Sequence, residues 1–427
     1  MKEATSPTFR SSPRLLVIVA LVVAGEAVFS LPFLVPRVFR PTLLDVFGIT
    51  NLELGTAFSA YGMVAIVSYV LGGPLADRFS ARTLMSIGLL VSALGGVCLA
   101  SIPSLAVLRM LFAFWGVATI LLFWAALIRA TREWGGARSQ GLAFGMLEGG
   151  RGLFAALLSS AAVFVFGSAL PAEAESATME QRKFALQVVI WIYTGFVIAS
   201  AVLVWTCVPR LPPASSGDGH HRFSWRSAAT VLSNKAIWLQ GIIIVCAYTA
   251  FKGMDDFSLF ARDGFGFNDV QAARVGTLAL WTRPAAALGA GLLADRISAP
   301  RAVLFCFCGL LAGYLVIGCG WLAPSIPWTL YMLVVTTGVL VYALRGVYFA
   351  LFGAARVPIA LTGTATGMVS VVGYTPDVFA GPLMGYFTDG YPGMRGHEYF
   401  FGTLAAFSAV GVVATLLFRR ACSGQHV

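Results

Sequence analysis

Charged side chains stand inside long apolar stretches of this sequence, where a charge needs a specific reason to be present. At the centre of a lipid bilayer a charged residue costs about 2.5–3.5 kcal/mol on insertion scales, so such residues face a protein interior and mark a function. A carboxylate there can exchange a proton, and a guanidinium or ammonium group can hold an anion. The residues of this kind are Glu26, Arg109, Glu148, Arg151, Lys252, Arg283, Arg345 and Asp377.

The excess of cations over acids in this set favours an anionic substrate. Arg345 is the strongest candidate for a substrate contact, because Tyr342 and Tyr348 stand three residues before and after it. A guanidinium among aromatic rings stacks on them and still presents its planar fork to a carboxylate or phosphate. The alternative is a gate in which Arg345 pairs with an acid that the sequence does not identify.

Lys252 and Arg283 are two further candidate anion ligands. Lys252 is followed by Asp255 and Asp256 at helical spacing, so a local ion pair is the competing interpretation. Arg283 precedes Pro284, a combination of charge and helix breaker that Pro376 and Asp377 repeat in reverse order. Proline frees a backbone carbonyl and kinks a span, commonly where the helix bends around a site.

Three carboxylates are candidates to carry a coupling proton: Glu26, Glu148 and Asp377. Glu148 and Arg151 lie three residues apart, close enough on one helix to pair. We expect either a neutral pair that locks this helix to its neighbour or a switch that senses a proton or substrate, and both interpretations stay open. The surrounding glycines allow close helix packing.

The elements that must position these charges are membrane-spanning helices. The sequence is 58% hydrophobic and 11% charged, with a mean hydropathy of +0.83. A helix needs about 20 apolar residues to cross a bilayer. Twelve such stretches predict an all-α membrane protein, with spans at 15–38, 53–75, 83–101, 104–128, 141–168, 186–208, 236–260, 270–293, 302–321, 328–350, 362–387 and 398–418.

The net charge of +10 comes mainly from Lys and Arg in segments that would face the cytoplasm if both termini lie there. This distribution predicts a multi-pass protein of a bacterial inner membrane with cytoplasmic termini, and it needs no nucleic-acid partner. The seven cysteines lie mostly within spans, so we expect neither disulfides nor a metal or other cofactor. The lipid bilayer and protons are the expected partners besides a small solute, and a monomer suffices.

The chain contains an internal repeat. Leu75-Ala76-Asp77-Arg78 recurs 218 residues later as Leu293-Ala294-Asp295-Arg296. Capping-box patterns at Thr50…Glu53 and Asn268…Gln271 keep the same offset. With the Pro- and Ser-rich segment 209–235 as a linker, the sequence predicts two pseudo-symmetric six-helix bundles, 1–208 and 236–427.

The stretch Gly73-Pro74-Leu75-Ala76-Asp77-Arg78, followed by Arg82, resembles the signature of the major facilitator superfamily, and its second copy resembles it too. The resemblance covers the whole chain through span count, orientation, linker and repeat. It implies a conformational latch that stabilises an outward-open state and releases as the halves rock. The latch residues would be Gly73, Asp77, Arg78, Arg82, Asp295, Arg296 and Arg301.

The resemblance also implies that spans 1, 4, 7 and 10 line a central cavity and that Arg109 takes part in proton coupling. The chain is loosely similar to the nitrate-porter and organophosphate branches. Span 2 lacks the arginine of nitrate porters, and span 1 offers only Arg37 near its outer end as a partner for Lys252. Both departures disfavour those two substrates.

The sequence therefore predicts a secondary transporter, with proton-coupled symport of a small organic anion as the leading hypothesis. The alternatives are a proton-driven drug or metabolite efflux antiporter and a membrane sensor that binds without transporting. An enzyme is not expected, because no histidine lies within a predicted span to serve a nucleophile.

Overall fold

The computed structural model describes residues 14–136, 140–171, 173, 176–210, 234–355 and 369–423. The N-terminal half is built from helices whose bounds are α1 Arg14–Phe29, a π-helical turn Ser30–Leu34, α2 Val35–Val38, α3 Arg40–Phe47, α4 Asn51–Arg78, α5 Ala81–Ala100, α6 Leu105–Gly116, a second π-helical stretch Val117–Trp124, α7 Ala125–Gly135, α8 Gln140–Ser168 and α9 Met179–Cys207.

The C-terminal half continues with α11 Lys235–Gly253, a 3₁₀ turn Met254–Asp256, α12 Phe257–Phe265, α13 Asp269–Ile297, α14 Ala299–Gly318, α15 Pro327–Val347, a 3₁₀ turn Tyr348–Ala350, α16 Leu351–Ala354, α18 Pro376–Gly390 and α19 Met394–Ser423. Residues 211–233, which form most of the predicted linker 209–235, lie outside the described residues. So do residues 356–368, which include the predicted start of span 11.

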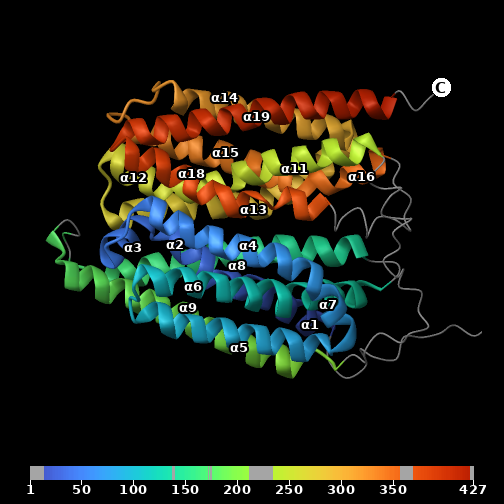
Figure 1. The fold of residues 1–427 in the computed structure, drawn as a ribbon, viewed down its shortest axis with the longest axis horizontal. Helices are drawn as coiled ribbons and strands as arrows, with labels where there is room; N and C mark the ends of the chain where they lie inside the picture. Colours follow the sequence, from blue (N-terminus) through green and yellow to red (C-terminus); the bar gives the residue numbers. More distant parts are fainter. Residues whose placement is uncertain are drawn as a thin grey trace, which may run out of the picture.

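Ten stretches of the described chain are long and apolar enough to cross a membrane. The other two expected spans correspond to α13 and α18, which lie parallel to the rest of the bundle (Figure 1). Helix α13 contains charged residues along its 29-residue length, and only 15 residues of α18 are described as one helix. The chain is an all-α membrane protein.

The repeat is visible in the local structure. Helices α4 and α13 begin at Asn51 and Asp269, and α5 and α14 begin at Ala81 and Ala299, each pair 218 residues apart. Both predicted capping boxes form, with reciprocal bonds at the start of α4 and of α13. Gly48 and Gly266 end the preceding helices with positive φ angles of 60° and 67°, a conformation that glycine adopts without strain.

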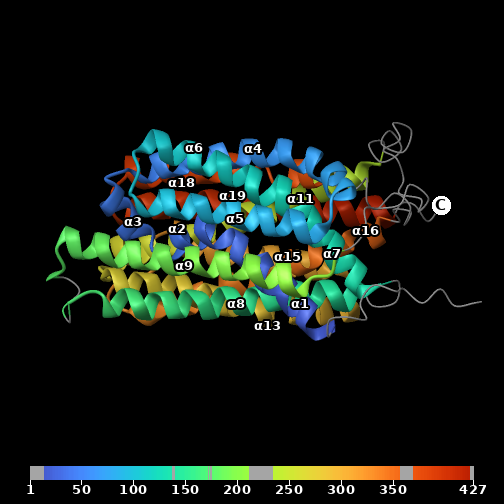
Figure 2. The same ribbon diagram turned by 90° about the horizontal axis from the view of Figure 1, so that it is seen from below.

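The two halves lie side by side, and their buried apolar side chains form two clusters, one mainly in each half. In Figure 1 the N-terminal half, blue to green, lies below the C-terminal half, yellow to red. Helix α4 packs against α18, and α8 packs against α13, which the rotated view in Figure 2 also shows. These two helix pairs carry the contact between the halves, so they position any site at the centre.

Candidate functional site

The halves meet closely at the end of the bundle that holds α3 and α12, opposite the C-terminus (Figure 1). We call this contact the outer seam; its members are Arg37, Asn51, Leu52 and Gly55 on one half and Asp255, Gly381 and Asp389 on the other. Arg37 Nε lies 2.5 Å from Asp255 Oδ1, with both side chains 5% exposed. The backbone N–H groups of Asn51 and Leu52 donate to the Asp389 carboxylate at 3.2 and 2.7 Å, so an acid of one half caps α4 of the other.

Glycines allow the backbones of α4 and α18 to touch along the outer seam. A Cβ added at Gly55 would lie 2.5 Å from the backbone of Gly381, and one at Gly62 would lie 2.7 Å from that of Asp377. Ser59 donates a hydrogen bond to the Val378 carbonyl between these two contacts. The outer half of this helix pair is therefore closed without room for side chains.

Four of the predicted charges form a closed ring of alternating sign, which we call the charged ring: Glu26, Arg151, Glu148 and Arg283. Arg151 contacts Glu26 at 3.5 Å and Glu148 at 2.7 Å. Arg283 contacts each of these carboxylates at 3.2 Å. Three members come from α1 and α8, whereas Arg283 comes from α13 of the other half. The ring therefore joins the two halves.

Small residues give the arginines their room in the charged ring. A Cβ at Gly152 would lie 2.8 Å from Cγ of Arg283, and one at Gly25 would lie 3.1 Å from Cδ of Arg151. The glycines of α8 that the sequence interprets as packing sites thus serve partly to admit an arginine. The two acids differ in access, since the side chain of Glu148 is 45% exposed and that of Glu26 only 4%.

A second group of charges runs from the centre to the outer seam. Lys252 Nζ lies 3.2 Å from Asp377 and 3.8 Å from Asp255, which in turn binds Arg37. The hydroxyl of Tyr248 donates to Asp377 at 3.1 Å. The predicted local pairing of Lys252 is thus present, but its shorter ion pair is with Asp377, from a different helix. These four side chains, which we call the Lys252 chain, contain two cations and two acids: Lys252, Arg37, Asp255 and Asp377.

Arg345 is surrounded by aromatic rings. Its guanidinium carbon lies 3.9 Å from the ring centroid of Phe251 and 5.5 Å from that of Tyr248. Among the described residues no carboxylate lies within ion-pair distance of Arg345, and its buried Nη1 has no hydrogen-bond acceptor. Unlike the cations of the ring and of the Lys252 chain, this one is uncompensated by the described part of the protein.

The predicted tyrosines beside Arg345 in sequence do not both flank it in space. The ring of Tyr342 lies 5.9 Å from the guanidinium of Arg283, and its buried hydroxyl has no hydrogen-bond partner within the described chain. Tyr348 packs its ring on Phe349. The rings of Tyr248 and Phe251, both on α11, lie beside the guanidinium of Arg345.

The halves diverge toward the end that bears the C-terminus, which the charge distribution predicts to be cytoplasmic. Gly152, Gly149 and Gly145 follow one another at helical spacing on the face of α8 that meets α13. Gly152 is packed on Arg283, yet a Cβ at Gly149 or Gly145 would meet no atom within 4 Å. Open space therefore lies beside this part of α8 within the described structure, and the half-exposed side chain of Glu148 is next to it.

Arg109 and the predicted latch residues lie away from the charged ring. Arg109 is exposed and donates to Thr56 at 2.8 Å. Arg82 stacks at 4.6 Å on the ring of Trp205. The side chains of Asp77 and Asp295 lie outside the described residues, and the remaining latch residues are exposed on the surface: Gly73, Arg78, Arg296 and Arg301.

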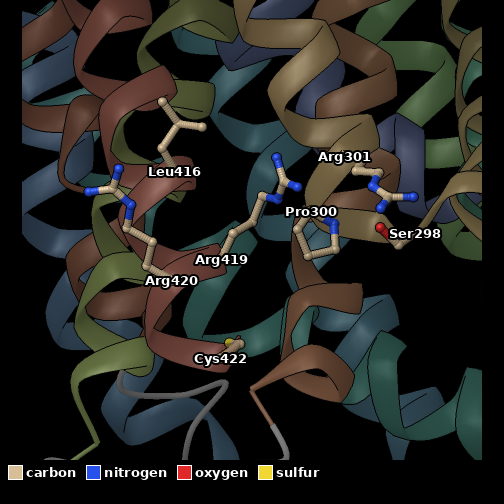
Figure 3. Close-up of a pocket in the computed structure, with 7 residues that line it drawn as sticks. All are labelled: Ser298, Pro300, Arg301, Leu416, Arg419, Arg420 and Cys422. Atoms are coloured by element: carbon tan, nitrogen blue, oxygen red, sulfur yellow. The ribbon is translucent and has the colours of Figure 1, made fainter. Parts of the chain in front are cut away.

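A cavity of about 550 Å³ opens beside the turn between α13 and α14. Figure 3 shows its lining, in which Arg419 extends between Arg420 and Arg301. The other lining residues are Ser298, Pro300, Leu416 and Cys422. All of these belong to the C-terminal half and none is a central charge, so we place the candidate substrate site at Arg345 instead.

Sequence reasoning missed several charged residues of the outer end. It named Arg37 only as a residue near the outer end of span 1 and did not single out Arg40, whereas the structure buries both, at 4% and 0% exposure. It also placed His397 outside the spans, whereas this side chain is fully buried in α19 and bound to Asp256 at 2.6 Å. The repeat offset was the available signal, because it maps Arg37 onto Asp255.

Comparisons with known proteins agree on the family. Residues 15–376 match the Major Facilitator Superfamily. The inner membrane protein YqcE of Escherichia coli is 26% identical over 404 residues, which is 92% of each chain. The inner membrane protein YihN of the same organism is 26% identical over 412 residues, 93% of each chain.

Solved structures share the fold. The nucleoside transporter NupG superimposes with a TM-score of 0.69 at 15% identity, covering 95% of this chain and 98% of that one. A bacterial homologue of the human lysosomal transporter Spinster gives 0.69 at 15% identity, covering 98% of each. The chain belongs to the Major Facilitator Superfamily and is a multi-pass secondary transporter of the inner membrane, not an enzyme.

Proposed function

We propose that this transporter carries a small organic anion in symport with protons by alternating access. In this cycle the outer seam opens when the cytoplasmic side closes, and closes when that side opens. Arg345 is the proposed contact for the anion. Glu148, within the charged ring, is the proposed proton acceptor, with Glu26 and Asp377 as the neighbouring carboxylates. The transporter is proposed to act as a monomer.

The observation that carries the proposal is the uncompensated guanidinium of Arg345. A cation held among apolar and aromatic side chains within a membrane protein is costly unless an anion pairs with it. The described protein pairs Lys252, Arg151 and Arg283 with acids but supplies none to Arg345. An organic carboxylate that accepts hydrogen bonds from the guanidinium fork supplies the missing acceptor and charge.

Proton coupling follows from the arrangement of Glu148. Its carboxylate binds Arg151 of its own helix and Arg283 of the other half. Protonation removes its negative charge and weakens both ion pairs, and the second of these joins the halves. Glu148 is also accessible from the open side, whereas Glu26 is buried. Proton binding at Glu148 therefore acts directly on the contact that has to change when the halves rock.

The test is uptake of a panel of radiolabelled organic acids into proteoliposomes, measured against external pH. Wild-type uptake should fall as external pH rises and should acidify the lumen. Arg345→Ala should reduce uptake at least tenfold, and Arg345→Lys should fall between it and wild type because it keeps the charge but loses the fork. Glu148→Gln should retain anion exchange but lose the pH dependence of net uptake.

Arg274→Ala is the matched control, since Arg274 is an exposed arginine of the same half and lies outside the charged clusters described above. It should transport like wild type. A preference for neutral or cationic solutes that Arg345→Ala leaves untouched contradicts the anion proposal and favours efflux. Binding without flux in any assay identifies a sensor.

A further inference from the structure

The charged residues around the centre limit the net negative charge of a substrate that can bind there. The charged ring contains two arginines and two glutamates, each glutamate contacting both arginines. The chain of Lys252 and Arg37 contains two cations against Asp255 and Asp377. Each group is neutral when its members are ionised, so Arg345 leaves a single positive charge among the central residues.

The surroundings of Arg345 also limit how an anion approaches it. The ring of Phe251 covers one side of the guanidinium at 3.9 Å, and Tyr248 lies at 5.5 Å. The hydroxyl of Tyr248 is directed at Asp377. The Nη1 group of Arg345 has no hydrogen-bond acceptor among the described residues, so it is available to donate to a ligand. One carboxylate binds at the edge of a guanidinium through two parallel hydrogen bonds.

We propose that the transporter selects monoanions over dianions of the same size, an inference that rests on the proposed function. A second carboxylate would find no uncompensated cation beside Arg345, because the other described buried arginine without a carboxylate at ion-pair distance, Arg40, lies at the outer seam and donates to Asn51. It would have to displace Asp377 or Glu148 from an existing ion pair, or enter with an extra proton. The expected discrimination is about a hundredfold, the ratio that corresponds to the insertion cost of one charge at mid-membrane.

The experiment compares matched mono- and dicarboxylates by calorimetric titration of purified protein at neutral pH. The pairs are gluconate with glucarate and benzoate with phthalate, which differ mainly in one carboxylate. Tighter binding of the monoanion in the pairs that bind supports the inference. Equal or tighter binding of the dianion overturns it but leaves anion transport standing. Binding of neither member of any pair, nor of the wider organic acid panel, rejects the proposed function itself.

A charge-removing variant tests the count of charges directly. Asp377→Asn removes one negative charge from the Lys252 chain and leaves a second uncompensated cation near the centre. The affinity ratio of dianion to monoanion should rise at least tenfold. Asp389→Asn is the matched control, because Asp389 lies on the same helix but binds the start of α4 at the outer seam, and it should leave the ratio unchanged.

Glu148→Gln provides the same test through the charged ring if Asp377→Asn fails to fold. It leaves two arginines against Glu26, so the ratio should again rise. An unchanged ratio in a folded variant of either kind, or an equal rise in Asp389→Asn, refutes the inference. The affinity ratio of dianion to monoanion is measured because a purely structural defect weakens the binding of both ligands by the same factor.

Discussion

Arg37 and Asp255 occupy equivalent positions in the two repeats, 218 residues apart, and they bind each other at 2.5 Å. Residues that contact their own repeat counterpart lie close to the pseudo-two-fold axis that relates the halves. If both repeats carried the same residue there, two arginines or two aspartates would meet in a buried place. Opposite charges at this pair of positions therefore close the outer seam in a way that identical halves cannot.

Removing Asp255 should open the outer seam more than removing Arg37. Asp255→Leu leaves Arg37 with no carboxylate partner among the described residues, and an uncompensated buried charge costs about 3–5 kcal/mol. Arg37→Leu leaves Asp255 with Lys252 at 3.8 Å, so its effect should be smaller. The double variant should be closer to wild type than Asp255→Leu.

The measurement is the reactivity of Ser59→Cys, in a cysteine-free background, toward an impermeant thiol reagent added from outside. Ser59 is part-buried in the contact between α4 and α18, so a cysteine there should react faster when the seam opens. A double variant that reacts faster than both single variants contradicts the charge argument.

Gly55→Ala should also open the outer seam, for a steric reason. Its Cβ would lie 2.5 Å from the Gly381 backbone, and overpacking of this kind costs about 1–3 kcal/mol. Gly149→Ala is the matched control, because a Cβ there meets no atom within 4 Å. The same Ser59→Cys reporter should react faster in the first variant and unchanged in the second. Equal reactivity in both would show that close backbone contact does not hold the seam.

Asp77→Asn should slow transport several-fold while leaving substrate affinity close to wild type. The latch proposed for this residue acts on the rocking equilibrium rather than on the substrate site. Binding by calorimetry and flux in proteoliposomes separate the two effects. Wild-type flux in Asp77→Asn rules out the latch role, and a matching loss of affinity and flux points to misfolding instead.

The orientation of the chain can be tested with two cysteines. Ser325 lies in the exposed loop between α14 and α15, and Arg132 lies near the end of α7, at opposite ends of the bundle. In intact cells an impermeant reagent should label Ser325→Cys and not Arg132→Cys, and permeabilised cells should label both. The reverse pattern would invert the membrane orientation.

Much of the fold was predictable from the sequence because bilayer thickness and backbone hydrogen bonding restrict what can span a membrane. The repeat was readable from the Asp77 and Asp295 motifs, and the capping boxes at Thr50 and Asn268 formed as predicted. The pairing of Glu148 with Arg151 was also predictable, since it depends only on spacing along one helix.

The contacts between helices were not predictable in this way. Nothing in the local sequence indicates that Arg283 reaches Glu26 and Glu148, or that Lys252 reaches Asp377. The expected excess of two positive charges falls to one at the centre because Arg109 is exposed and bonded to Thr56, whereas Arg37 and Asp255 add one charge of each sign. Arg345 has no carboxylate at ion-pair distance among the described residues, and the rings of Tyr248 and Phe251 from α11 lie beside its guanidinium.

The proposed binding of one monoanion at Arg345 and one proton at Glu148 has an electrical consequence. In the proposed cycle the loaded protein gains one monoanion and one proton, so its net charge equals that of the empty protein. Moving one elementary charge through 100 mV corresponds to about 2.3 kcal/mol, but this cycle moves none. The membrane potential therefore does no work on transport, and the pH gradient alone sets how far the solute accumulates.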